Sequence, residues 1–277
     1  MQARLNRRQQ GGFTLVEMAV VLVIIGVILG AVMIGRDVQR NAEYTRIKQK
    51  FIDQWVVTYN NYHQRYGAPF ADNQAAPQLM VNGRSFATGS TFSGGDMTGT
   101  AEPDMICSGS DPVPTTTGFS RTHQSGSDFD LRDMVRKAGI TLPPGRGEGK
   151  EDRYAYLDTN GNPQEIRVCF GWNRPGSPHG SGNSMIITGL TPDLARALDQ
   201  MIDGKPDAAN GAFRQYVTGL TRNATASGGA TSAAAIGTEW GGNNTGSMSA
   251  AASAEAMGTA SDDDQVMTVV ANYKMNQ

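Results

Sequence analysis

Glu17 is a carboxylate inside an otherwise apolar run that extends from Phe13 to Ile34. A charged side chain at the centre of a membrane helix costs about 2.5–3.5 kcal/mol even on insertion scales. An acid that is retained there indicates a functional site with a partner group. The alternative is an ordinary signal anchor that carries an incidental glutamate.

Other residues that could do chemistry give weaker signals. The glycine-rich stretch 145–150 lacks the preceding strand and the spacing of a phosphate loop, so we expect a surface loop. The oxygens of 158–162 and Glu165 faintly suggest calcium, but they are fewer than an EF-hand needs and the Asn-Gly pair also predicts a hairpin turn. The acidic run 262–264 is more typical of a solvated turn. The sequence therefore indicates no catalytic site, cofactor or metal centre.

The element that carries Glu17 is an apolar helix. At about 1.5 Å per residue, the run from Phe13 to Ile34 reaches about 33 Å, which is enough to cross a bilayer. It is too long for a usual signal-peptide core, and no obvious cleavage site follows it. Gly26 and Gly30 form a G-x-x-x-G pair, which lets helices approach closely.

A basic leader precedes this helix, and the junction between them reads Gly11-Gly12-Phe13-Thr14-Leu15-Val16-Glu17. This arrangement resembles the class III signal of type IV pilins and type II secretion pseudopilins. The resemblance implies that a prepilin peptidase cuts between Gly12 and Phe13 and that Phe13 is then N-methylated. It also implies that Glu17 neutralises the N-terminal ammonium of a neighbouring subunit during assembly.

The resemblance further decides the topology, which charge counting leaves nearly undecided. Basic residues lie on both sides of the apolar run, at Arg4, Arg7 and Arg8 before it and at Arg36, Arg40, Arg46, Lys48 and Lys50 after it. In the family, the N-terminus is cytoplasmic in a single-pass inner-membrane protein, which then enters a pilus or pseudopilus in the periplasm or at the cell surface. The implied partners are prepilin peptidase, other pilin or pseudopilin subunits in a homo- or hetero-polymer, and an inner-membrane assembly platform. The formal net charge of −2 gives no indication of nucleic-acid binding.

The helix is expected to continue beyond the membrane. Apolar and aromatic residues recur at helical spacing on one face, at Ile47, Phe51, Trp55, Tyr59, Tyr62 and Tyr66. Gly67 and Pro69 then predict its end. Many family members have a proline where this chain has Ile34, so the expected helix runs unbroken from Phe13 to Tyr66.

The predicted organisation has four parts: a leader (1–12), a transmembrane or filament-core helix (13–34), its amphipathic continuation (35–67) and a loop-rich α+β head (68–277). The resemblance implies a pilin-like fold in which the long helix packs on an antiparallel sheet. Within the head, we expect strands at 79–81, 105–107, 153–158, 164–170, 184–188 and 266–273, and helices at 131–138 and 191–202, the first capped by Asp128 or Asp130. Leu194, Leu198, Met201 and Ile202 should lie on one face of the second helix. The low-complexity stretch 223–260 is either a surface loop or a poorly packed alanine helix.

The two cysteines, Cys107 and Cys169, would lie outside the cytoplasm in this topology. There, a pair most simply forms one disulfide, and the alternative is two buried thiols. Closing a loop of about 60 residues would contribute about 4 kcal/mol in the chain-entropy model.

The sequence thus predicts a non-enzymatic structural subunit of a type IV pilus or pseudopilus. A mature chain of residues 13–277 is large for the family, which favours a minor or a decorated subunit. The alternative is a membrane-anchored periplasmic enzyme or ligand-binding protein with an uncleaved N-terminus. Adhesion, secretion and DNA uptake all stay open.

Overall fold

The computed structural model describes residues 15–86, 101–111, 113, 119, 121–124, 126, 128–177, 179–216, 240 and 268–275. The chain divides into two compact units, Met1–Glu43 and Tyr44–Gln277. The second, called here the C-terminal unit, contains the sheet. The low-complexity stretch 223–260 lies outside the described residues except for Trp240.

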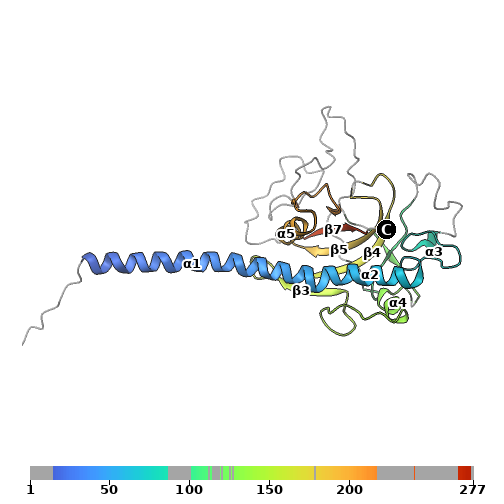
Figure 1. Ribbon diagram of the computed structural model, residues 1–277, viewed down its shortest axis with the longest axis horizontal. Coiled ribbons are helices and arrows are strands. Elements are labelled where there is room, and N and C mark those ends of the chain that lie inside the picture. The colour runs from blue at the N-terminus through green and yellow to red at the C-terminus, as the bar shows by residue number, and fades with distance from the viewer. Residues whose placement is uncertain are drawn as a thin grey trace, which may run out of the picture. The chain divides into compact units, whose positions relative to one another are not determined.

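The first element is a long helix in three consecutive segments, α1 (Leu15–Ile47), a π-helical turn η1 (Lys48–Ile52) and α2 (Asp53–Tyr66) (Figure 1). It ends at Gly67, which has a φ of 67° and donates its backbone N–H to the carbonyl of His63. Glycine takes this left-handed conformation without steric cost. The prediction of one helix that runs as far as Tyr66 is therefore confirmed.

The π-helical turn has a cause in the spacing of the buried stripe. An α-helix turns by about 100° per residue, so each step of four residues overshoots a full turn by about 40°. The three such steps from Ile47 to Tyr59 would rotate the stripe by about 120° away from the core. Because a π-turn holds an extra residue, it returns the later side chains to the buried face. Ile47, Phe51, Trp55 and Tyr59 are all fully buried.

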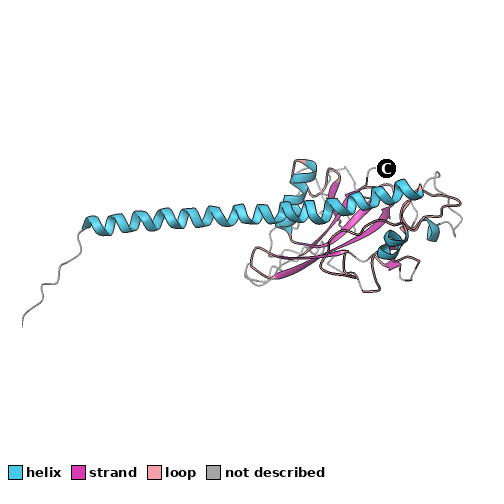
Figure 2. Ribbon diagram, turned by 60° about the horizontal axis from the view of Figure 1, so that its bottom comes forward, coloured by secondary structure: helices cyan, strands magenta, loops and turns pink. Residues whose placement is uncertain are grey.

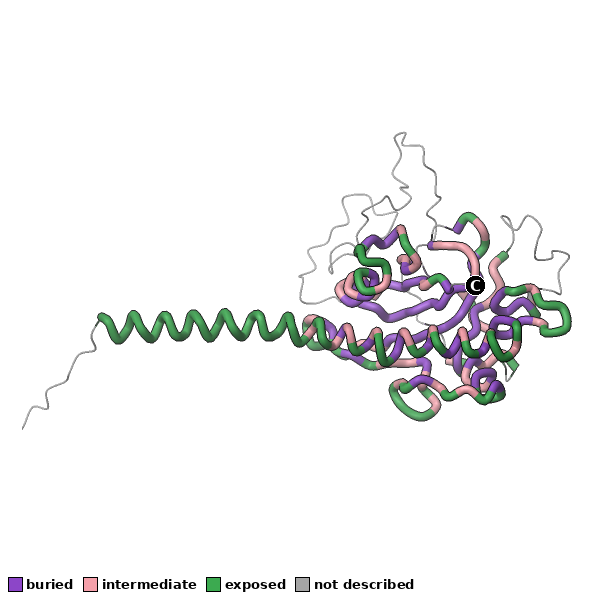
Figure 3. The backbone as a smooth tube through the Cα atoms, in the orientation of Figure 1, coloured by how far each residue is buried: buried purple, intermediate pink, exposed green. Residues whose placement is uncertain are grey.

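Within the C-terminal unit, the buried face of η1 and α2 packs on the sheet through aromatic rings. Tyr59 stacks on Phe170 with ring centroids 5.3 Å apart, and Phe51 lies 5.5 Å from Tyr154. The opposite face of α2 is exposed, as Figure 3 shows by its alternating colours. This one-sided burial explains why only one face of α2 is apolar.

The sheet contains seven described strands and is antiparallel except for one pair (Figure 2). Their order is β2-β1-β4-β5-β7-β6, and β3 also pairs with β4. The strands are β1 (Met105–Ile106), β2 (His123–Gln124), β3 (Arg153–Leu157), β4 (Pro163–Asn173), β5 (Gly182–Leu190), β6 (Phe213–Gln215) and β7 (Val269–Lys274). The predicted α+β class, with a long N-terminal helix, is confirmed.

The hairpin of β3 and β4 forms around the predicted Asn-Gly turn. One oxygen of Asp158 accepts the backbone N–H groups of Asn160 and Asn162, at 2.9 and 2.8 Å. Gly161 has a φ of 85°, as the turn requires. The carboxylate considered as a calcium ligand is therefore engaged in the turn itself.

The predicted helices are present with their caps. Helix α4 (Leu131–Lys137) begins at Asp130, whose side chain accepts the N–H groups of Arg132 and Asp133. Helix α5 (Pro192–Asp203) begins after Thr191, whose hydroxyl accepts the N–H of Leu194. A short helix, α3 (Gly83–Phe86), was not expected.

One local prediction was wrong. Residues 79–81 form a turn instead of a strand, because Asp72 accepts the N–H groups of Gln78 and Leu79 and Leu79 has a φ of 57°. Met201 is 36% exposed, since the buried face of α5 is made by Leu194, Ala195 and Leu198. A helical repeat fixes the direction of a side chain but does not fix how far the covering layer extends.

Candidate functional site

The apolar surface of α1 is the first candidate. Every large apolar side chain from Leu15 to Ile34 is exposed, and Val38 as well. Among the described residues, this helix alone is long and apolar enough to cross a membrane, with a mean hydropathy of 2.9 over its most apolar 18 residues. A helix satisfies its own backbone hydrogen bonds, so this surface suits lipid or the helices of other subunits.

Glu17 lies in the first turn of α1 and is exposed. The helix N-terminus carries partial positive charge, which favours an acid at this position. Gly26 and Gly30 lie one turn apart, and a Cβ added to either would meet no atom within 4 Å. The chain alone therefore leaves the glycine face open to close approach by another helix. Gly12 and Phe13 lie outside the described residues.

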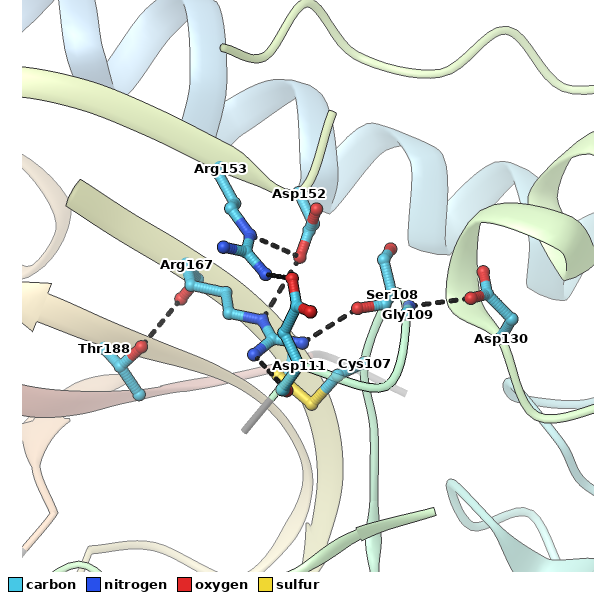
Figure 4. The surroundings of a disulfide bond; sticks show 10 residues. Cys107, Ser108, Gly109, Asp111, Asp130, Asp152, Arg153, Arg167 and Thr188 are labelled. Carbon is cyan, nitrogen blue, oxygen red and sulfur yellow. Dashed lines mark hydrogen bonds and ion pairs between the residues drawn. A yellow bond between two sulfur atoms is a disulfide. The ribbon is translucent and has the colours of Figure 1, made fainter. Parts of the chain in front are cut away.

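The disulfide is the second candidate region. Cys107 and Cys169 are fully buried and bonded to each other, with a sequence separation of 62 (Figure 4). Cys107 directly follows β1, and Cys169 lies within β4, where Ile106 and Phe170 are register partners. The bond therefore joins two segments that already pair in the sheet.

A buried arginine, Arg167, binds the loop that follows Cys107. The Nε of Arg167 donates to Asp152 Oδ2 at 3.2 Å, and its two terminal nitrogens donate to the carbonyls of Asp111 and Ser108, each at 2.8 Å (Figure 4). Arg167 is only 3% exposed and Asp152 only 1%. Burial raises the pKa of Asp152, and the charges of Arg167 and Arg153 partly offset this effect. The loop that follows Cys107 is thus fixed both by a covalent bond and by an ion pair.

Further contacts hold this loop from outside. Lys150 and Arg153 donate to one carboxylate oxygen of Asp111, at 2.7 and 2.6 Å, and they lower the pKa of Asp111. The N–H of Gly109 donates to Asp130, the cap of α4, at 2.7 Å. These contacts position the loop that follows Cys107.

The sequence interpretation missed the Arg167 network. A signal was present, because Arg167 stands between Ile166 and Val168 in a run that is otherwise apolar. An arginine within a buried strand requires a paired acid, but its partner Asp152 is distant enough in sequence that spacing alone does not identify it.

In the described part of the chain, the three histidines lie on separate segments. No cluster of three or more His, Cys, Asp or Glu side chains that could hold a metal occurs there. His63, His123 and His179 lie on α2, on β2 and after β4, respectively. His179 is buried against Tyr216, with ring centroids 4.2 Å apart, and burial lowers the pKa of His179 to about 4.

The comparisons with known proteins bear on the N-terminal segment. Residues 7–33 match the family profile of the prokaryotic N-terminal methylation motif. No curated protein and no solved structure matches the chain significantly. The matched segment contains Gly12, Phe13, Glu17, Gly26 and Gly30. The chain therefore carries the N-terminal signature of the type IV pilins and pseudopilins.

Proposed function

We propose that this chain is a structural, non-enzymatic subunit of a type IV pilus or pseudopilus. Prepilin peptidase cuts it between Gly12 and Phe13, Phe13 is N-methylated, and the mature chain polymerises through α1. The observation that carries the proposal is the methylation motif at residues 7–33, which includes the start of a helix whose large apolar side chains from Leu15 to Ile34 are all exposed.

Glu17 supplies the chemistry of assembly. Cleavage creates a new ammonium group at Phe13, and burying that charge among apolar helices is costly. A carboxylate a few Å away attracts it strongly where the dielectric constant is low. Glu17 of one subunit therefore pairs with the Phe13 ammonium of the next, while Gly26 and Gly30 let the helices approach closely.

The C-terminal unit fits a minor or decorated subunit. Its disulfide suits the periplasm or the cell exterior, where thiols are oxidised. Before assembly the chain resides in the inner membrane with its N-terminus in the cytoplasm. Its partners are prepilin peptidase, other pilin or pseudopilin subunits and the inner-membrane assembly platform.

The test compares Glu17→Ala with Glu43→Ala, a control acid on the same helix. We expect both chains to lose residues 1–12, and only Glu17→Ala to be absent from sheared filaments or pseudopili. Mass spectrometry of the membrane and filament fractions measures both outcomes. Normal incorporation of Glu17→Ala would refute the role of Glu17, and an intact Met1 on the native chain would favour an uncleaved membrane-anchored protein instead.

A further inference from the structure

Asp199 is a buried carboxyl group on the inner face of α5. It is fully buried, and its Oδ2 accepts two hydrogen bonds, from the indole Nε1 of Trp240 at 2.8 Å and from the backbone N–H of Asp207 at 2.7 Å. Its Oδ1 is equally buried and accepts no hydrogen bond. One oxygen of this carboxyl thus ties together three segments, while the other lacks a donor.

A second acid lies one helical turn further along α5. Asp203 is within hydrogen-bond reach of the Asp199 side chain. The two oxygens of Asp203 already accept the N–H groups of Ala212 and Phe213, at 3.1 and 2.8 Å. Asp203 is thus held as a hydrogen-bond acceptor at the start of β6. If both carboxyl groups are ionised, each can only accept; a proton on Asp199 would let Asp199 donate a hydrogen bond to Asp203.

Glycine at position 211 makes this arrangement possible. A Cβ at Gly211 would lie 2.2 Å from Asp203 Oδ2, and its φ of 92° also favours glycine. The backbone can therefore approach the Asp203 carboxylate closely enough for the next two N–H groups to bind it.

The charged groups around Asp199 do not neutralise it. From α5, Arg196 pairs with Asp193 at 2.9 Å and donates to the carbonyl of Trp240 at 3.3 Å. From the turn after α5, the Asp207 carboxylate accepts the N–H of Ala209. In the described ranges, no lysine or arginine forms an ion pair with Asp199.

The surroundings act on the acid in opposing directions. Burial and the neighbouring Asp203 raise the pKa of Asp199 to about 7, while the hydrogen bonds from Trp240 and Asp207 lower it. Burial raises the pKa of Tyr273, on β7, and the charges of Asp53 and Asp203 raise it further.

We propose that α5, the turn after it and Trp240 form a proton-dependent lock, in which a neutral Asp199 donates to Asp203 and holds Trp240 and the turn in place. Trp240 packs on Phe213, the first residue of β6, with ring centroids 5.2 Å apart. The lock thus joins α5 to β6 at the edge of the sheet. It also fixes the position of Trp240, which lies between β6 and β7 in the sequence.

The sign of the pH dependence follows from proton binding. The folded lock retains its proton up to a pH of about 7, whereas an exposed aspartate loses it near 3.8. Asp199 alone therefore makes the unfolding constant rise with pH by up to tenfold per unit between about 4 and 7, and its effect is constant above 7. The lock therefore stabilises the folded protein most at acid pH.

The experiment uses the full chain in detergent micelles, unfolded with urea at pH values from 4.5 to 8.5 and followed by near-ultraviolet circular dichroism. Asp199→Asn keeps an acceptor for Trp240 and gains a donor for Asp203, but it cannot titrate. We expect the ratio of wild-type to Asp199→Asn unfolding constants to rise roughly tenfold per pH unit up to pH 7 and then to level off. Asp128→Asn, an exposed control, should give a wild-type profile.

A flat ratio for Asp199→Asn would overturn the proposal, as would an equal effect in the control. Trp240→Phe provides a second arm that does not depend on the folding of the first variant. It keeps a ring against Phe213 but removes the N–H that lowers the pKa of Asp199. The midpoint of the pH dependence should then move above 7, and an unchanged midpoint would contradict the lock.

Discussion

Replacing Arg167 with methionine should destabilise the C-terminal unit by about 4 kcal/mol. Methionine matches the length of the buried stem but leaves the Asp152 carboxylate, at 1% exposure, with only the weaker ion pair to Arg153, whose Nε lies 3.8 Å from Asp152 Oδ2. Removing one partner of a buried ion pair typically costs about 3–5 kcal/mol. The carbonyls of Ser108 and Asp111 also lose their donors, which adds to the cost. For a unit of this size, the melting temperature should fall by roughly 10 °C.

Urea unfolding of the full chain in micelles, with the disulfide intact, measures this change. Arg146→Met is the matched control, because Arg146 pairs with Glu165 at an exposed position and such pairs contribute about 0–1 kcal/mol. Adding Asp152→Asn to Arg167→Met should recover much of the loss, since the buried charge disappears. The deficit of the single variant should also shrink as the pH falls and Asp152 takes up a proton. A loss below about 1 kcal/mol for Arg167→Met would refute the role of this ion pair.

Two further predictions concern the same unit. The double variant Cys107→Ser and Cys169→Ser should lose up to about 4 kcal/mol from the free energy of unfolding, because the closed loop of 62 residues is released, and it should still fold on the Arg167 network; urea unfolding checks both points. His179 is buried neutral with a pKa of about 4, so its own contribution to stability should fall as the pH drops from about 6.5 to 4, when the unfolded chain takes up a proton that the folded chain excludes. The ratio of wild-type to His179→Phe unfolding constants should therefore rise as the pH drops over this range, and a constant ratio would show that His179 is not responsible.

The local elements could be predicted because their signals are local. The stripe from Ile47 to Tyr66, the Asn-Gly turn at 160–161 and the caps Asp130 and Thr191 each depend on residues a few positions apart. Turn chemistry and side-chain capping act over the same short distances. The structure accordingly has these elements where the sequence indicates them.

The tertiary pairings could not be predicted in the same way. Arg167 finds Asp152 only after β3 and β4 pair, and Asp199 meets Trp240 from 41 residues away. A single tryptophan in a stretch of small residues suggests an anchor, but it does not identify the partner. At residues 79–81, the hydrogen bonds that Asp72 accepts from the backbone favour a turn, although the apolar side chains of the segment favour a strand. A buried carboxylate needs several donors.

The π-helical turn at Lys48–Ile52 gives the long helix one surplus residue at a defined place. Losing exposed Gln49 would convert this turn to ordinary α-helix, and the faces of Ile47 and Trp55 would keep their mutual orientation. Losing a residue from the middle of α2 instead would rotate every later ring by about 100° and move Tyr62 away from Phe70, whose ring centroid lies 4.4 Å from its own. Between Ile47 and Tyr66, the helix can therefore lose a residue at this turn without disturbing the aromatic contacts beneath it.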